Sequence, residues 1–380
     1  MSPKRVECLK KAWSYYLPSV KPYYAVKCNP DPQLLQILRK WDFGFDCASP
    51  RELELMTNKD DIIYANPCKS DLDLHYAKKH KSSPLTVVDS AEEVAKLAEN
   101  AYAGGALLRI KVDDTGSKMP FSTKFGLSLE SVKPLALWAK TKHIDLHGIS
   151  FHVGSASGVD DAHARGLEMA VRANADLREA GHQPTIIDIG GGFVPTFPAF
   201  SRAARHIMKT IKDTVPKEIR CIAEPGRFFA TESQDLFVQV IGKKPAFGGG
   251  WRYTIDESLY GQFTNILFDQ QRPRWIRVGE ERRPRGRGIL FGRTCDSLDV
   301  IAHSEDMDEL VVGDWLWFPK MGAYTSATAS EFNGFPKPPV FLDTESLLPA
   351  TLHISDRHSV GEIRYMKHVT VGDMMDVTKN

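Results

Sequence analysis

Residues 86–101 read TVVDSAEEVAKLAENA, a short β-branched run followed by an amphipathic stretch that begins with a serine. Ser90 and Glu93, three residues later, form the capping-box pattern that marks the start of a helix. The same pattern recurs at Ser49 and Glu52 in SPRELELM, directly after the run FGFDCA. Each stretch predicts one strand followed by one helix, which is the repeating unit of a parallel sheet.

Eight apolar, β-branched runs of this kind occur in the first 230 residues, separated by helical or polar stretches. They begin at Tyr23, Phe43, Ile62, Thr86, Ala106, His147, Thr185 and Arg220. Strands that are apolar nearly throughout are typical of a parallel sheet that is covered on both faces. We therefore predict an α/β fold with a (β/α)8 TIM-like barrel, and a doubly wound open sheet is the alternative.

The sequence pattern changes after about residue 230. Strand-like runs then follow one another without helical stretches between them, and glycine, proline or charged loops separate the runs. They are LFVQVIG, WRYTID, NILFD, GILFG, WLWFP and PVFLD. The pattern predicts a barrel over residues 1–230 and a mostly antiparallel β domain over residues 231–345. Residues 346–380 are polar, and their HVTVGDMMDV alternation fits either a late strand or a disordered tail.

Composition limits the classes of function. The chain has 380 residues, 42% of them hydrophobic and 26% charged, which is typical of a soluble globular protein. Its net charge of +1 gives no global field that would favour nucleic acid or an anionic membrane. The basic segment 272–287, RPRWIRVGEERRPRGR, is expected to be a solvated surface loop rather than a binding patch.

The cysteines and the hydrophobic pattern indicate where the protein resides. The six cysteines include no C-x-x-C pair, which argues against a structural zinc site and favours the reducing cytoplasm. No apolar run reaches the length of about 18 residues that a membrane span requires. The first residues also lack the apolar core of a secretory signal. We expect a cytoplasmic protein without a metal site.

Glycine and polar residues follow the predicted strands at their carboxyl ends, where barrels of this type place their active sites. Gly190, Gly191 and Gly192 come directly after TIIDI, and such a turn can bring backbone N–H groups close to a phosphate. Arg227 of EPGR and Ser155 of HVGS can add a cation and a hydroxyl from neighbouring strands. A second triplet, residues 248–250, lies in the β region and is expected to be only a turn.

Lys27 of AVKCN follows the first predicted strand, where burial can lower its pKa enough for Schiff-base formation with an aldehyde. Glu224 can hydrogen-bond a pyridine nitrogen, and His152 can lie against the face of the ring. An aldehyde, a phosphate and a pyridine nitrogen together describe pyridoxal 5′-phosphate, which we predict as the cofactor. Each residue alone would suit a structural role, and the set as a whole favours this site.

The motifs resemble those of the fold-type III pyridoxal-phosphate decarboxylases that act on ornithine, diaminopimelate and arginine, and most closely their eukaryotic ornithine-specific members. The resemblance rests on YYAVKCN, FDCAS, FHVGS, DIGGGF, AEPGRFF, YGQFTNILFD, FGRTCDSLD and GDWLWFPKMGAYT with EFNGF. It implies an alanine-racemase-like barrel with a C-terminal β domain. It also implies decarboxylation of L-ornithine to putrescine and CO2 in polyamine biosynthesis, with lysine or another diamino acid of specialised metabolism as the alternative.

The resemblance implies a role for individual barrel residues. Lys27 would bind the cofactor covalently, Glu224 would meet its pyridine nitrogen and His152 would stack on its ring. Asp46 and Arg109 would support the lysine and the ring. The phosphate ligands would be Ser155, Gly190, Gly191, Gly192, Arg227 and Tyr324.

The resemblance further implies a homodimer whose active sites are completed across the subunit interface. The second subunit would supply Cys295, which returns a proton to Cα after CO2 has left. It would also supply Asp269 and Asp296 to bind the substrate, and Phe332 would line the same mouth. Tyr260 is a further substrate-binding residue. A carboxylate at position 269 that meets the distal ammonium favours ornithine, then lysine. Lys124 and Asp299 match positions that pair between subunits.

Two other functions are compatible with this fold. An inactive paralogue that acts as a binding regulator would lose cofactor contacts, whereas all the residues named above are present. A racemase is disfavoured because a glutamate at the ring nitrogen promotes full delocalisation of a carbanion. Only 26 residues precede Lys27, fewer than is usual in the family, so we expect either that an N-terminal strand of the β domain is lost or that the start codon is misassigned.

Overall fold

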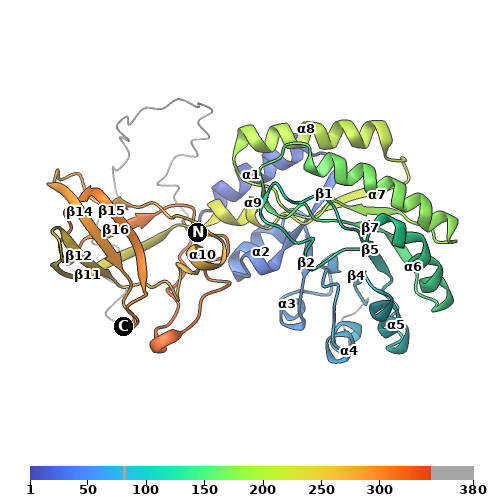
Figure 1. Ribbon diagram of the computed structural model, residues 1–380, viewed down its shortest axis with the longest axis horizontal. Helices are drawn as coiled ribbons and strands as arrows, with labels where there is room; N and C mark the ends of the chain where they lie inside the picture. The colour runs from blue at the N-terminus through green and yellow to red at the C-terminus, as the bar shows by residue number, and fades with distance from the viewer. Residues whose placement is uncertain (80–82, 344–380) are drawn as a thin grey trace. The chain divides into compact units, whose positions relative to one another are not determined.

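The computed structural model describes residues 1–79 and 83–343 (Figure 1). The chain forms two compact units. One is Leu9–Thr231, called the barrel unit here, and the other combines Met1–Cys8 with the chain from Glu232 onward and is called the β unit. The first eight residues thus belong to the β unit, although the sequence placed them with the barrel. None of the helices in the described ranges could cross a membrane, since none is both long and apolar enough.

Eight parallel strands close into a barrel, so the predicted (β/α)8 fold is confirmed and the open sheet is excluded. Their order around the barrel is β1, β10, β9, β7, β5, β4, β3 and β2. The bounds are β1 (Val20–Ala25), β2 (Gly44–Cys47), β3 (Ile62–Tyr64), β4 (Leu85–Val88), β5 (Ala106–Arg109), β7 (Leu146–Ser150), β9 (Ile186–Asp188) and β10 (Arg220–Ala223).

Helices surround these strands on the outside of the barrel (Figure 1). They are α2 (Pro32–Arg39), α3 (Pro50–Glu54), α4 (Asp71–Lys79), α5 (Ala91–Glu99), α6 (Leu129–Thr141), α7 (Ala162–Glu179) and α8 (Phe197–Thr214). A further helix, α1 (Pro3–Tyr16), precedes β1 and was not predicted. Inside the barrel, apolar side chains of the strands form a packed core, which includes Tyr23, Ile63, Val87, Leu107, Ile186 and Ile222.

The two predicted capping boxes are only half formed. Ser49 and Ser90 cap α3 and α5, since their hydroxyls accept the N–H groups of Glu52 at 3.3 Å and Glu93 at 3.2 Å. The glutamate side chains take other partners, however. Glu52 accepts the N–H of Ala48 at 2.6 Å, and Glu93 forms an ion pair with Lys69. The sequence pattern therefore located the helix starts correctly but not the glutamate contacts.

The β unit contains a six-stranded, mostly antiparallel sheet, as predicted. The strand order is β13, β16, β11, β12, β14 and β15, and only β12 and β14 pair in parallel. The bounds are β11 (Leu236–Pro245), β12 (Trp251–Ile255), β13 (Ile276–Arg277), β14 (Arg285–Phe291), β15 (Val300–Asp308) and β16 (Trp315–Phe318). The glycine triplet 248–250 forms the turn between β11 and β12, with positive φ at all three residues.

Two of the predicted strands are wrong. NILFD forms most of the helix α10 (Thr264–Phe268), and PVFLD has no regular structure over residues 339–343. Short apolar runs do not distinguish a strand from a helical turn. Conversely, β15 was missed because its sequence, VIAHSEDMD, is largely polar, as suits an edge strand. The proposed late strand within residues 346–380 lies outside the described residues.

The basic segment 272–287 is not simply a loop, because it contains β13 and the start of β14. Acidic residues of the same unit neutralise several of its arginines. Arg283 meets Asp314 at 2.6 Å, and Arg285 meets Asp306 at 2.8 Å and Asp308 at 2.7 Å. These ion pairs support a role within the β sheet over one in binding nucleic acid.

Candidate active site

Lys27 and Asp46 lie side by side at the carboxyl ends of adjacent strands. Lys27 is in η1 (Val26–Cys28), a short 3-10 turn that follows β1. Asp46 pairs in register with Ala25 of β1. The Lys27 Nζ atom is 2.5 Å from Asp46 Oδ2. Asp46 is fully buried, whereas the Lys27 side chain is 41% exposed, so burial of the lysine is less complete than the sequence suggested. The lysine tip remains accessible to a ligand.

Glu224 follows β10 and faces Asp188, the last residue of β9. The two side chains interact, and Asp188 is fully buried while Glu224 is only partly buried. Burial, followed by the charges of Asp188 and Asp46, raises the pKa of Glu224 well above its usual range. Burial raises the pKa of Asp188 to about 6. Two adjacent carboxyls in a desolvated site cannot easily both ionise, so this pair retains a proton more readily than ordinary acids do.

Arg109 and His152 complete the polar lining of the barrel mouth. The Arg109 guanidinium, at the end of β5, lies over the Phe125 ring at 4.9 Å. The imidazole of His152 accepts the Gly154 N–H at Nδ1, with a distance of 3.0 Å. Burial, and then the charges of Arg109 and Lys27, hold the pKa of His152 well below its usual range. His152 is therefore neutral at physiological pH, with its proton on Nε2, which suits stacking on an aromatic ring.

The glycine turn after β9 has no room for side chains. Gly190 and Gly192 have φ values of +66° and +97°, and an added Cβ at Gly190 would lie 2.2 Å from the Phe151 carbonyl. The Gly190 N–H donates to Asp188 Oδ1 at 2.9 Å, so it is not available to a phosphate. This assigns Gly190 a structural role, and the N–H groups of Gly191 and Gly192 remain as the candidate donors.

Arg227 and Ser155 come from different elements of the barrel unit and bring a guanidinium and a hydroxyl close together. Arg227 begins α9 (Arg227–Ala230), and its Nη2 donates to the Oγ of Ser155 at 3.0 Å. Ser155 begins β8 (Ser155–Ser157), which pairs with β6 (Ser117–Met119). The two side chains that the sequence analysis assigned to one phosphate therefore lie within hydrogen-bond distance of each other. Both groups are suited to a phosphate dianion.

In the β unit, an aromatic and acidic cluster brings together four of the predicted residues. The Tyr260 hydroxyl donates to Asp296 Oδ2, and the Tyr260 and Phe332 rings pack with centroids 4.6 Å apart. Cys295, adjacent to Asp296, is exposed and donates its backbone N–H to Asn333 Oδ1 at 2.9 Å. Hydrogen bonds from the Leu298 N–H and the Tyr260 hydroxyl lower the pKa of Asp296 and favour its ionised form.

Asp269, Tyr324 and Asp299 are the remaining predicted residues of the β unit, and they lie in three different segments of the chain. Asp269 follows α10 and is 6% exposed. Tyr324 is half-buried and has a φ of +53°. Asp299 is 1% exposed, and its carboxylate accepts the N–H groups of Leu259 at 2.7 Å and Thr294 at 3.0 Å. The expected pairing of Asp299 with Lys124 of a second subunit stays a prediction.

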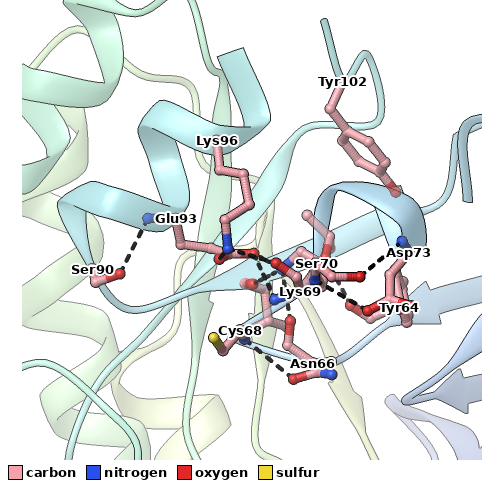
Figure 2. Close-up of polar contacts among 12 residues, drawn as sticks. Tyr64, Asn66, Cys68, Lys69, Ser70, Asp73, Ser90, Glu93, Lys96 and Tyr102 are labelled. Atoms are coloured by element: carbon pink, nitrogen blue, oxygen red, sulfur yellow. Dashed lines mark hydrogen bonds and ion pairs between the residues drawn. The ribbon is translucent and has the colours of Figure 1, made fainter. Parts of the chain in front are cut away.

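A buried lysine network at the barrel mouth was missed by the sequence analysis (Figure 2). Lys69, in the loop after β3, has a fully buried side chain, and its ammonium lies 2.7 Å from Glu93 Oε1. The same ammonium donates to the carbonyls of Asn66 at 2.6 Å and Val87 at 2.9 Å. Glu93 also accepts Lys96 Nζ at 2.8 Å. The signal in the sequence was NPCKS, which places a lysine just after the strand IIY, as AVKCN does after the first strand.

This network connects three loops that follow β2, β3 and β4. The Asn66 side chain donates to the carbonyl of Ala48, two residues after Asp46, at 3.2 Å. Lys69 bonds Val87 in β4, and Glu93 lies in the first turn of α5. The network therefore holds the loop beside Asp46 in place without contributing a group to the lysine site itself.

The chemistry of the barrel mouth fits pyridoxal phosphate. Lys27 offers an accessible amine, and Arg227 with Ser155 and the glycine turn offers cationic and hydrogen-bonding groups for a phosphate. One carboxylate oxygen of the lysine site, Asp46 Oδ1, is buried without a hydrogen-bond partner in the described chain. Buried polar atoms of this kind usually have a partner, so a polar ligand in this site is consistent with the donor set.

Comparison with known proteins agrees with this geometry. The pyridoxal binding domain of the pyridoxal-dependent decarboxylases matches residues 4–231. An ornithine decarboxylase of Schizosaccharomyces pombe is 40% identical over 351 residues, covering 88% of this chain and 81% of that protein. Antizyme inhibitor 2 of Xenopus laevis is 36% identical over 346 residues, covering 85% of this chain and 76% of that protein.

A solved structure shows the same likeness over both units of the chain. The arginine decarboxylase of Paramecium bursaria Chlorella virus, bound to agmatine, is 35% identical and has a TM-score of 0.85. The match covers 90% of this chain and 94% of that one. The sequence motifs, the barrel fold and the matched relatives all indicate the same family. The chain belongs to the family of pyridoxal-dependent decarboxylases.

Proposed function

We propose that this protein decarboxylates a basic L-amino acid, with L-ornithine as the favoured substrate and putrescine and CO2 as the products. The observation that carries the proposal is the contact of Lys27 with buried Asp46 at 2.5 Å, in a barrel mouth that also holds Glu224, Arg109 and His152. This set provides an amine, an acid for a ring nitrogen and a neutral ring for stacking. Decarboxylation to putrescine would supply the diamine of polyamine biosynthesis.

Bound pyridoxal phosphate supplies an electron sink for the electron pair that remains on Cα when CO2 leaves. Lys27 holds the cofactor through Nζ, and Asp46 orients that nitrogen by accepting its proton in a hydrogen bond. Glu224 would hold a proton at the ring nitrogen, for which its raised pKa is suited. His152 covers the ring as a neutral imidazole and adds no positive charge that would compete for the proton.

The β unit contributes the proton donor and the groups that select the substrate. Cys295 is exposed, and we propose that its S–H bond breaks as a C–H bond forms at Cα after CO2 has left. Asp296, whose pKa is lowered, and the nearly buried Asp269 would accept the distal ammonium of the substrate. A buried carboxylate left without its ammonium is costly, so neutral side chains would be rejected strongly.

We further propose a homodimer in which this cluster serves the barrel of the second subunit. Two large apolar side chains near Cys295 in the β unit are exposed in the single chain: Leu298 is 73% exposed and Phe332 is 44% exposed. Their exposure supports the proposal that a second subunit covers this surface. Large apolar side chains that are exposed together commonly mark an interface. The six cysteines, all free, are consistent with the proposed cytoplasmic location.

Two alternatives follow from the relatives. An arginine-specific or lysine-specific enzyme would share the barrel site and differ only in the residues that meet the distal end of the substrate. A regulator without catalytic activity is suggested by the likeness to an antizyme inhibitor. The presence of Lys27, Glu224 and Cys295 favours the enzyme over the regulator.

The proposed function is tested by measuring CO2 release from the purified full chain with ornithine, lysine, arginine and diaminopimelate, and with leucine as the neutral comparison. We expect the highest kcat/KM with ornithine, a lower value with lysine and none with leucine. Lys27→Ala is the control and should abolish release from every substrate. No release from any of these amino acids, despite bound cofactor, would refute the proposal and favour the regulator.

A further inference from the structure

We infer that Asp188 is a positioning residue of the cofactor site, which fixes the glycine turn with one carboxylate oxygen and supports Glu224 with the other. The inference rests on the proposed cofactor site but not on the identity of the substrate. Asp188 is the last residue of β9 and pairs in register with Ser150 of β7 and Ile222 of β10. It is fully buried, so it acts only through the residues around it.

The first contact of Asp188 determines the shape of the glycine turn. Oδ1 accepts the Gly190 N–H at 2.9 Å, which holds this residue at its φ of +66°. The turn cannot relax toward its neighbours, since an added Cβ at Gly191 would lie 2.8 Å from both the Glu224 carbonyl and His152 Nε2. With Gly190 held, the N–H groups of Gly191 and Gly192 keep a fixed orientation. Such a concave backbone turn is suited to an anion.

The second contact joins the turn to Glu224. The Glu224 N–H donates to the Gly190 carbonyl at 2.7 Å, so Gly190 is bonded by Asp188 through its N–H and by Glu224 through its carbonyl. The side chains of Asp188 and Glu224 interact, and Asp188 Oδ2 is buried and accepts no hydrogen bond within the described residues. A proton shared between the two carboxyls would satisfy Oδ2, and a buried acceptor without any partner would be costly.

Several charged groups surround the pair. Asp46 of β2 adds a third carboxylate, while Lys27 of η1 and Arg109 of β5 add two cations. Arg109 also interacts with Asp89, which follows β4, so carboxyls outnumber cations around the pair and favour a retained proton. Burial raises both pKa values, that of Asp188 to about 6, and the charges of Asp188 and Asp46 raise that of Glu224 further, so the pair retains a proton more readily than ordinary acids do.

These contacts give the two carboxyls different tasks. Glu224 is the partly exposed member and can reach a ligand, whereas Asp188 lies behind it and cannot. Toward a pyridine nitrogen, Glu224 would give up the proton that the pair retains, so that the O–H bond breaks as an N–H bond forms. Both carboxyls would then carry a negative charge, and the charge of Asp188 would stabilise the positive ring nitrogen through Glu224. One residue thereby controls the binding site of the phosphate and the protonation of the ring.

Two substitutions separate these tasks. In Asp188→Asn, the amide keeps an oxygen that can accept the Gly190 N–H. The amide cannot share an acidic proton with Glu224 or carry a negative charge. Asp188→Ala removes both functions. Cys221→Ala is the matched control, because Cys221 is buried in β10, the strand beside Asp188, and belongs to no part of the proposed site.

The experiment uses the full-length protein loaded with pyridoxal phosphate. The phosphorus-31 resonance of the bound cofactor reports the glycine turn, and the pH titration of its visible absorbance reports the ring nitrogen. For Asp188→Asn we expect an unchanged phosphorus resonance and a spectral transition about one pH unit lower, because a supporting negative charge is lost. For Asp188→Ala we expect the same lower transition, a shifted phosphorus resonance and cofactor dissociation at least about tenfold faster. Cys221→Ala should titrate as the wild type does.

The outcomes distinguish this inference from the proposed function. An Asp188→Asn protein that titrates as the wild type does would overturn the inference, even if ornithine is decarboxylated. Equal phosphorus resonances in both Asp188 variants would overturn the link to the glycine turn. If Asp188→Ala fails to fold, the titration of Asp188→Asn still decides the question. A wild-type chain that shows no visible band would overturn both the cofactor site and this inference.

Discussion

Removing the buried Lys69 ammonium should destabilise the barrel unit far more than removing an exposed one. In Lys69→Met, Glu93 keeps its 3% exposed carboxylate but loses a cation at 2.7 Å, and only the more exposed Lys96 remains as a charged partner. The carbonyls of Asn66 and Val87 lose the same donor. Breaking a buried ion pair by removing one partner typically costs about 3–5 kcal/mol. We expect a loss of this size.

An exposed pair of similar geometry provides the control. Lys133 and Glu179, on α6 and α7, are 2.6 Å apart, and their side chains are 48% and 61% exposed. Water screens such a pair, so Lys133→Met should cost at most about 1 kcal/mol. Because methionine replaces lysine in both variants, the difference between them isolates the effect of burial.

Urea unfolding followed by tryptophan fluorescence gives the two free energies, and thermal melting gives an independent check. For a unit of this size, about 1 kcal/mol corresponds to roughly 2–4 °C in Tm. Lys69→Met should therefore melt roughly 6–20 °C lower than the wild type, whereas Lys133→Met should stay within about 4 °C. Equal losses in the two variants would refute the claim that the Lys69 network holds the barrel mouth.

The pH dependence of this difference follows from the pKa of Lys69. Burial lowers that pKa below its usual value of 10.5 in the folded chain. Between the lowered value and 10.5 the unfolded chain binds more protons, so the free energy of unfolding rises with pH. Lys69→Met lacks this group. The stability of the wild type relative to the variant should therefore increase as the pH is raised through that window, and a decrease would contradict the burial of a charged lysine.

Three further predictions concern catalysis. Cys295→Ala should retain the cofactor while diamine formation falls by about 10²- to 10⁴-fold, as measured by product chromatography, because a general acid is lost after CO2 release. Mixing inactive Lys27→Ala with inactive Cys295→Ala subunits should restore activity to about one site per mixed dimer, since each subunit supplies what the other lacks. Asp269→Ala should raise the KM for ornithine and reduce the preference for charged over neutral side chains, as competition between substrates would show.

Each of these predictions has a result that would contradict it. Undiminished diamine production by Cys295→Ala would remove the proposed proton donor. If activity does not recover after verified subunit exchange, Lys27 and Cys295 act within one chain. An unchanged substrate ranking in Asp269→Ala, or wild-type turnover of leucine equal to that of ornithine, would show that other residues select the substrate.

The barrel could be predicted because its strands repeat one local pattern. Runs such as TVVD followed by a capped helix specify a βα unit within a few residues, and eight units leave few possible folds. Lys27 and Asp46 could be placed together for the same reason, since both follow strands at one end of a parallel barrel. The short apolar run NILFD had no such context, so its pattern did not distinguish the observed helix from a strand.

The residues that the sequence analysis missed act through partners that are distant in sequence. Asp188 lies within the run TIIDI, and nothing in that run shows that its carboxyl meets Glu224, which follows a different strand. Lys69 is one of many lysines, and its burial depends on Glu93 and on the carbonyls of two loops. Asp299 could be assigned to a subunit contact only by resemblance, whereas its burial is a property of the folded β unit.

The most direct test of the account is to identify the lysine that binds the cofactor. The protein is purified with pyridoxal phosphate, reduced with borohydride, digested and analysed by mass spectrometry, and Lys27→Ala is treated in parallel. We predict a visible absorption band before reduction and a single pyridoxyl adduct on Lys27, with neither present in Lys27→Ala. An adduct on Lys69 or on any other lysine instead of Lys27 would contradict the site proposed here.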